Sequence, residues 1–313
     1  MPAEKRLDWR KNAFAISHKI SDDLHYPHTA AYASLPFFAN TQPFPMPNLK
    51  CPSCDHPLQL TGNSWHCDNG HRFDRAKRGY TNLLLAQHRR SRAPGDDKAM
   101  VQARTAFLEL GRYQPLADAL LAGLGDDDQP WLDIGCGEGW YTCQFAQRLG
   151  SDNGVGVDIS KFAVDAAAKR DRALTWLVAS GARLPLFNDS QQRIFVLFTR
   201  LFTDDIARVL KPGGELIVVG TGEQHLLPLR EALYEEVRQS GFDAGKFLDA
   251  RFTQIDSQDI HLEWIPDDEQ ELQNLLAMTP HHWRAKPEAK AGIGKLVGKA
   301  MNAHFVIQRW RRI

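Results

Sequence analysis

From Trp131 onward, short apolar runs alternate with segments of helical periodicity, and this alternation limits the fold more than any other feature of the sequence. The expected strands are 131–134, 154–158, 174–178, 193–199 and 215–219. The expected helices are 140–149, 161–169, 203–209 and 226–239. Continuous apolar strands separated by helices predict an α/β fold with a mostly parallel sheet covered on both faces.

Before and after this central region the pattern predicts five further elements. Asp96-Asp97 can begin a helix that runs to Leu110, and Pro115 can begin a second helix that ends near Leu124. The tail adds strands near 252–263 and 303–310, with a helix near 267–277. Residues 211–214, Lys-Pro-Gly-Gly, predict a turn before the fifth strand.

A glycine-rich loop joins the first expected strand to the first expected helix of this region. It reads Asp133-Ile134-Gly135-Cys136-Gly137-Glu138-Gly139. Glycine is needed where the backbone turns sharply and lies against a ligand. A dinucleotide fingerprint, Gly-x-Gly-x-x-Gly, would require glycine where this chain has Trp140. The loop therefore favours a nucleotide-type ligand other than a dinucleotide.

The Asp-x-Gly-x-Gly-x-Gly form resembles motif I of class I S-adenosylmethionine (AdoMet) methyltransferases. Asp158 follows Gly139 by nineteen residues and ends the next expected strand. A carboxylate at that position can accept hydrogen bonds from both ribose hydroxyls. The resemblance implies a Rossmann-like, mostly parallel sheet of seven strands, with Ala179 and Ser180 beside the adenine.

A second cluster precedes this loop and has the spacing of a zinc site. The expected ligands are Cys51, Cys54, Cys67 and His71. Two close pairs can converge on one tetrahedral ion and leave no position for water, which favours a structural site. Residues 51–75 are too few and too polar for a hydrophobic core without a metal. His56 and His66 are alternative fourth ligands, and scattered reduced cysteines are the alternative to a site.

The chain has 313 residues, a length that favours more than one domain. We expect a flexible N-terminal extension at 1–46, a small zinc-ribbon-like domain at 47–75, a basic linker with helices at 76–124, and a methyltransferase domain at 125–313. Met46 precedes the first cysteine by five residues, so we hypothesise that it is the native start or that residues 1–45 are a dispensable tail.

The formal net charge is zero, so any surface for nucleic acid must be local. No run is apolar enough to span a membrane, and the N-terminus lacks the apolar core of a secretory signal. Grouped free cysteines fit a reducing cytoplasm.

The local cations follow the zinc cluster directly. They are Arg72, Arg75, Lys77, Arg78, Arg89, Arg90 and Arg92, against a single acid, Asp74. A second basic run, from Arg284 to Arg312, includes Arg309. Clustered cations of this kind neutralise phosphates, although a solvated basic face is the alternative interpretation.

With both halves placed, residues 51–313 resemble the bacterial 23S rRNA guanine-N1 methyltransferase family of the RlmA type. The matching segments are Cys51–Cys54, Cys67–Asp74, Gly79–Leu84, Gln87–Arg92, Pro94–Asp96, Gln102–Arg104, Gly111–Leu116, Asp133–Gly139, Met278–Pro280 and Trp283–Ala285. Residues 1–45 lie outside the resemblance. Gln192 and Thr199-Arg200 depart from the family, which has Asp before the fourth strand and a small residue with Pro after it.

The resemblance implies AdoMet-dependent methylation of guanine N1 in a 23S rRNA hairpin, with the zinc domain and basic linker contacting the RNA. The implied cofactor contacts are Tyr113, Asp133, Gly135, Gly137, Glu138, Gly139, Trp140, Asp158, Ala179 and Ser180. Guanine N1 carries a proton and pairs in a duplex, so the target base must be unpaired or flipped. No catalytic base is nominated, and His225 and His282 are weak candidates.

Two other functions stay open. One is a small-molecule methyltransferase, which the basic linker disfavours, and the other is a non-catalytic RNA-binding protein with a decayed cofactor fold. Whether the chain forms a homodimer also stays open.

Overall fold

The structure is a computed structural model that describes residues 48–89, 91, 93–125 and 128–313. The expected N-terminal extension, Met46 included, therefore lies outside the described residues, as do the linker residues Arg90 and Arg92. Within the described part, no helix is long and apolar enough to cross a membrane.

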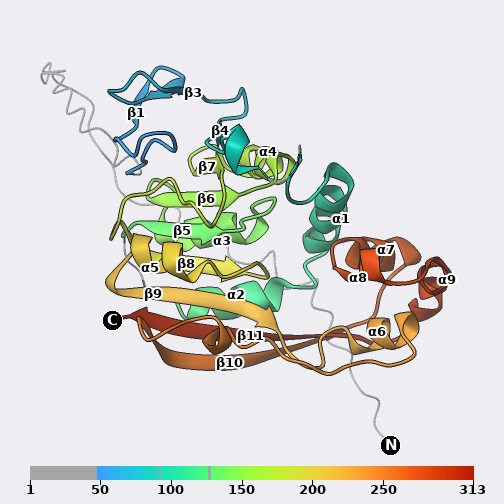
Figure 1. Cartoon of the computed structure of the whole chain (residues 1–313). Helices are drawn as coiled ribbons and strands as arrows, with labels where there is room; N and C mark the ends of the chain where they lie inside the picture. The colour runs from blue at the N-terminus through green and yellow to red at the C-terminus, as the bar shows by residue number, and fades with distance from the viewer. Residues whose placement is uncertain (1–47, 90, 92, 126–127) are drawn as a thin grey trace, which may run out of the picture. The chain divides into compact units, whose positions relative to one another are not determined.

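Eight strands form one sheet in the order β10-β11-β9-β8-β5-β6-β7-β4 (Figure 1). They are β4 (Thr81–Asn82), β5 (Trp131–Ile134), β6 (Gly154–Asp158), β7 (Thr175–Val178), β8 (Gln191–Leu197), β9 (Leu210–Thr221), β10 (Phe252–Trp264) and β11 (Met301–Arg312). Neighbouring strands from β4 to β9 are parallel, whereas β11 runs antiparallel to both β9 and β10. The predicted mostly parallel sheet is confirmed.

The helices are α1 (Lys98–Glu109), α2 (Gln114–Ala122), α3 (Trp140–Leu149), α4 (Lys161–Arg170), α5 (Thr203–Val209), α6 (Leu227–Leu233), α7 (Glu269–Ala277), α8 (His281–Arg284) and α9 (Pro287–Ala291). Short 3-10 turns are η2 (Ala86–His88), η3 (Ala244–Lys246) and η4 (Ile293–Leu296). The Asp97 carboxylate accepts a hydrogen bond from the Met100 amide and caps α1, as the sequence predicts.

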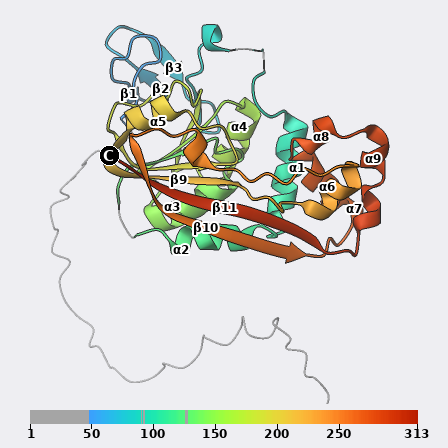
Figure 2. The same ribbon diagram turned by 60° about the horizontal axis from the view of Figure 1, so that its bottom comes forward.

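Both faces of the sheet are buried, which explains the continuous apolar strands. Trp131 and Phe195 pack with α2 and α3 on one face. Leu132 and Ile194, their chain neighbours, pack with α5 on the other. Successive side chains of a strand point to opposite faces, so a sheet covered on both sides needs apolar residues at every position. Figure 2 shows the long strands β9, β11 and β10 side by side beyond this central part.

Three local predictions differ from the structure. The sheet gains an eighth strand because linker residues Thr81 and Asn82 pair with Leu177 and Val178 of β7. Residues 211–214 lie inside β9, where the pairing with β8 shifts register, instead of forming a separate turn.

Helix α6 is also shorter than expected and ends at Leu233. Tyr234 leaves the helix with extended backbone, and its hydroxyl lies 3.0 Å from Nδ1 of His281. The helix therefore ends where Tyr234 contacts a distant segment, although the sequence pattern would continue it to 239.

Residues 48–75, which carry the predicted zinc ligands and are called the zinc segment below, contain a small antiparallel sheet. Its strands are β1 (Gln59–Thr61), β2 (Ser64–His66) and β3 (Arg72–Asp74). Its own apolar core is small and continues into the large sheet's core, where Leu49 pairs with Leu186. The amide of Lys50 also donates to the Pro185 carbonyl, 3.0 Å away. The segment therefore packs on the α5 face of the sheet.

Candidate metal and cofactor sites

The four predicted metal ligands come together, with ligand atoms within 4.8 Å of one another. The Cys54 and Cys67 sulfurs are 3.6 Å apart, and Nδ1 of His71 lies 3.6 Å from Cys51 Sγ and 3.4 Å from Cys67 Sγ. Zn–S bonds of about 2.3 Å and Zn–N bonds of about 2.0 Å at tetrahedral angles require spacings of roughly 3.5 to 3.8 Å. The donor set and its spacing therefore fit a structural zinc ion.

The two alternative histidines lie outside this cluster. Nδ1 of His56 lies 3.0 Å from the Cys54 carbonyl oxygen and 3.3 Å from the Asn69 side chain. His66 is the last residue of β2 and does not belong to the group of converging ligand atoms. Of the three histidines weighed from the sequence, the structure brings only His71 to the cysteines.

The glycine loop turns between β5 and α3 with all three glycines in the left-handed region, at φ of 77°, 57° and 79°. A Cβ on Gly135 would lie 2.6 Å from the Thr199 side chain. A Cβ on Gly139 would lie 2.8 Å from the Trp176 ring. Glycine is therefore required at both positions, by the left-handed backbone and by the lack of room for a Cβ. At these two positions the loop packs against the residue that follows β8 and against β7.

Two carboxylates flank the loop. Asp133 is buried, and its carboxylate accepts a hydrogen bond of 2.5 Å from the Thr142 hydroxyl. Burial raises the pKa of Asp133 to about 7. Asp158 accepts from the Gly137 amide at 3.1 Å and from the Ser160 amide at 2.7 Å, and burial raises its pKa as well. The predicted ribose carboxylate thus lies directly against the glycine loop.

Arg104 of α1 lies over the same loop. Its Nε donates to Glu138 at 2.5 Å and its Nη1 to Asp96 at 2.6 Å, whereas its buried Nη2 has no hydrogen-bond partner among the described residues. This nitrogen is 3.1 Å from where a Cβ on Gly137 would stand. A buried N–H group that points at the loop and lacks a partner can donate a hydrogen bond to a bound ligand.

The loop region is acidic, since Asp96, Glu138 and Asp158 lie close to Arg104, and Asp133 lies close to Glu138 and Asp158. AdoMet carries a sulfonium and an ammonium against one carboxylate. Four carboxylates around the loop therefore fit the net positive charge of AdoMet.

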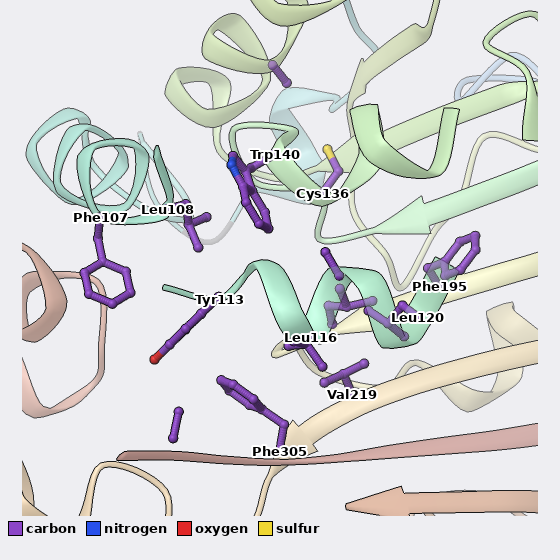
Figure 3. Close-up of a cluster of buried hydrophobic side chains, with 14 of the residues drawn as sticks. Phe107, Leu108, Tyr113, Leu116, Leu120, Cys136, Trp140, Phe195, Val219 and Phe305 are labelled. Atoms are coloured by element: carbon purple, nitrogen blue, oxygen red, sulfur yellow. The ribbon is translucent and has the colours of Figure 1, made fainter. Parts of the chain in front are cut away.

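Tyr113 is buried in an aromatic cluster between α1 and β11 (Figure 3). Its ring packs edge-on against Phe107 at 5.1 Å and against Phe305 at 4.9 Å between centroids. The hydroxyls of Tyr113 and of Tyr141 on α3 are buried without a partner in the described chain. Tyr113 thus serves as a core residue whose one polar atom stays available to a ligand.

The remaining predicted cofactor residues lie at the same edge of the sheet. Trp140 begins α3 and packs on Tyr141 with ring centroids 4.7 Å apart. The Ala179 amide donates to the Asp158 carbonyl. Ser180 lines a cavity of about 240 Å3 that also has walls from the zinc segment (Pro52) and the linker (Leu83).

Fewer cations of the basic linker are available to bind phosphate than its composition indicates. Arg78 pairs with Asp165 of α4, and Arg72 pairs with Asp74 at 2.9 Å. Arg75 and Arg89 donate to backbone carbonyls, and neither pairs with a carboxylate among the residues that the structure describes. In the C-terminal run, Arg309 is buried and pairs with Glu215, so it does not face solvent.

Sequence reasoning missed Arg104 and Tyr141, whose partnerless polar atoms the structure brings to the region of the glycine loop. Arg104 stands in one of the segments that carry the family resemblance, but its place over the loop depends on how α1 packs.

Comparison with known proteins gives matches to both halves of the chain. The family model described as RlmA, N-terminal, matches residues 49–92, and the model described as Methyltransferase domain matches residues 132–214. The chain is similar to a 23S rRNA (guanine(748)-N(1))-methyltransferase of Streptomyces fradiae. The two are 32% identical over 253 residues, which cover 78% of this chain and 88% of the relative.

Two further relatives extend over similar lengths. YxjB of Bacillus subtilis (strain 168) is 30% identical over 251 residues, covering 76% of this chain and 87% of its own. A protein of Micromonospora griseorubida is 28% identical over 268 residues, covering 77% and 89%. Both carry provisional names as 23S rRNA (guanine-N(1)-)-methyltransferases. Identity at this level along most of both chains is a family relationship, and the chain belongs to the 23S rRNA (guanine-N1)-methyltransferases, AdoMet-dependent enzymes with an N-terminal zinc ribbon.

Proposed function

We propose that this chain transfers the methyl group of AdoMet to N1 of a guanine in a 23S rRNA hairpin. Its zinc ribbon and basic linker contact the RNA, and the glycine loop holds the cofactor. The observation that carries the proposal is the joint cavity beside Ser180, which has walls from the zinc segment, from the linker, and from the loop after β7 and helix α5 of the methyltransferase domain. A module used only for folding would not need to border the cofactor end of the sheet.

The metal and cofactor residues have separate tasks in this proposal. Cys51, Cys54, Cys67 and His71 hold zinc and so fix the ribbon from which the linker starts. Asp158 binds the ribose, and the glycine loop with Glu138 and Arg104 binds the amino-acid end of AdoMet. Asp133 orients the loop through Thr142. In this proposal the linker also contributes β4 to the methyltransferase sheet.

AdoMet supplies an electrophilic methyl group on a positive sulfur. The chain's contribution is proximity, because an in-line approach of N1 to that methyl needs alignment more than covalent help. The N1 proton must leave and the base must be unpaired or flipped, so the site has to hold a single nucleotide out of its stack.

The test is to incubate the protein with labelled AdoMet and 23S rRNA that lacks its modifications, and then to map the label. Label on a guanine N1 supports the proposal. Label elsewhere on the RNA, or AdoMet binding without RNA labelling, contradicts it, and the second result favours a small-molecule substrate. Absence of AdoMet binding would indicate a decayed cofactor site.

A further inference from the structure

Two strained residues flank the carboxyl ends of β8 and β9. Phe198 follows β8 with φ of 56°, and Leu226 precedes α6 with φ of 51°. The other non-glycine residues with positive φ in the described ranges are Asp55 and Asp189. Aspartate tolerates this region, whereas a bulky phenylalanine or leucine does not adopt it without support from its surroundings. Strain of this kind gathers at functional sites.

Phe198 is held in its strained conformation beside the cofactor loop. Its amide donates to the Val219 carbonyl at 3.0 Å, and the next residue, Thr199, lies against Gly135. The ring is 6.3 Å from Tyr141 and 5.3 Å from Phe305 between centroids, yet the residue is 45% exposed. The strain thus presents an aromatic surface at the end of the strand that touches the glycine loop.

A cavity of about 470 Å3 opens beyond the end of β9, between α6 and α8. Its charged lining consists of Arg230, Arg238 and Arg284 against Glu236. Arg230 donates to three backbone carbonyls and pairs with no carboxylate in the described ranges. The side chains of Arg238 and Arg284 have no hydrogen bond or ion pair within the described part of the chain. The cavity therefore has a net positive lining.

Two histidines in the same lining stay uncharged. Nδ1 of His225 is buried and has no hydrogen-bond partner among the residues described, and its ring lies 4.9 Å from Phe305. Burial lowers the pKa of His225 to about 3, with smaller contributions from His281 and Arg230. Burial and the charges of Arg230 and Arg284 also lower the pKa of His281. At neutral pH the arginines supply the positive charge, and His225 supplies a neutral hydrogen-bonding atom.

Phe305 joins the two features, because its ring contacts both Phe198 and His225. An exposed aromatic face next to an arginine-lined cavity matches an unpaired nucleotide, whose base can stack and whose phosphate carries the charge. We propose that one unpaired nucleotide of the rRNA binds here, with its base against Phe198 and its phosphodiester on Arg238 and Arg284. This inference rests on the proposed function and adds the place where the RNA meets the methyl donor.

The experiment uses full-length protein, AdoMet and an unmodified 23S rRNA transcript. Phe198→Leu removes the aromatic face and Phe198→Tyr keeps it. Arg238→Gln with Arg284→Gln removes the two cavity charges. A matched control, Arg172→Gln with Lys211→Gln, also removes two charges. These residues lie away from the cavity, between α4 and β7 and at the amino end of β9.

We expect all variants to bind AdoMet as the wild type does. Phe198→Leu should slow single-turnover methylation at saturating RNA about ten-fold or more, because base stacking on an aromatic ring contributes on that scale, and Phe198→Tyr should restore the rate. The cavity pair should weaken RNA binding and lower the slope of log affinity against log salt by roughly one or more. The control pair should change neither.

Equal behaviour of the cavity pair and the control pair, or an unchanged rate in Phe198→Leu, would overturn the inference. Failure of the proposed function gives a different result, since the wild type itself would then label no guanine. In that case the RNA-binding measurements still decide whether the cavity contacts RNA.

Discussion

Arg104 of α1 and Glu138 of the glycine loop form an ion pair in which Nε and Oε2 are 2.5 Å apart, with the Glu138 side chain only 4% exposed. Removing one member of such a pair leaves a buried charge without compensation. We expect Arg104→Met to lower the free energy of unfolding by about 3 kcal/mol, measured in urea. Arg104→Met with Glu138→Gln should cost less than the sum of the two single variants.

Arg78 offers the matched control for this prediction. It also pairs with a carboxylate from a distant segment, Asp165, but both side chains are about a third or more exposed. Exposed pairs contribute less than about 1 kcal/mol, so Arg78→Met should leave stability nearly unchanged. Equal losses in Arg78→Met and Arg104→Met would contradict the importance of the buried pair.

The zinc cluster predicts a metal-dependent fold for the ribbon. Cys51→Ser or Cys67→Ser should release the bound zinc, measured by elemental analysis, and should unfold residues 48–75, measured by amide hydrogen exchange. Cys143→Ser in α3 is the control and should retain zinc, because it lies outside the converging ligands. Full zinc retention in both ligand variants would exclude the site.

Asp133 predicts a pH dependence of AdoMet binding. Its pKa is raised from 3.8 to about 7 by burial, and a cationic ligand favours the ionised carboxylate. AdoMet affinity should therefore rise with pH from 6 to 8 in calorimetric titrations, and Asp133→Asn should remove most of that rise. An unchanged pH profile in Asp133→Asn would show that another group is responsible.

The raised pKa of Asp133 also makes the stability of the protein depend on pH. Stability without AdoMet falls as pH rises, whereas AdoMet affinity rises. Because the folded-state pKa lies above the unfolded one, the folded protein without AdoMet binds an extra proton in this window. Its contribution to stability is complete below about pH 4 and is lost as pH rises to about 7. The difference in unfolding free energy between wild type and Asp133→Asn should follow that window.

A side chain at Gly135 is expected to clash with its neighbours, in addition to straining the backbone. Gly135→Ala places a Cβ 2.6 Å from Thr199, whereas Gly213, with the same φ of 77°, has no atom within 4 Å of its Cβ position. Both variants carry the strain of a left-handed alanine, about 1–2 kcal/mol. Only Gly135→Ala should also abolish AdoMet binding, which calorimetry would measure. Equal AdoMet affinities in the two variants would contradict the clash.

The central sheet was predictable because its apolar residues are continuous along each strand. Trp131 to Ile134 are all buried, and such a run has few alternatives. Strand β4 was not predictable, because two residues such as Thr81 and Asn82 become a strand only through their pairing with β7. The early end of α6 depends in the same way on the contact between Tyr234 and His281.

The metal and cofactor groups were visible in the sequence because their residues are close together along the chain. The cavity beyond β9 was not, because residues near 225, 238 and 284 meet only in the folded chain. Counting cations along the linker also overestimated its free charge, since Asp165, the partner of Arg78, lies 87 positions away.

The pairing of β4 with β7 bears on how such a protein can be divided. Without residues 81–82, the outer side of β7 would be an uncovered strand edge, which invites pairing with other chains. The segment that leads away from the zinc ribbon thus also closes the sheet against self-association. A recombination event that exchanged the ribbon alone would have to keep this strand, together with the contacts of Leu49 and Lys50 with Leu186 and Pro185.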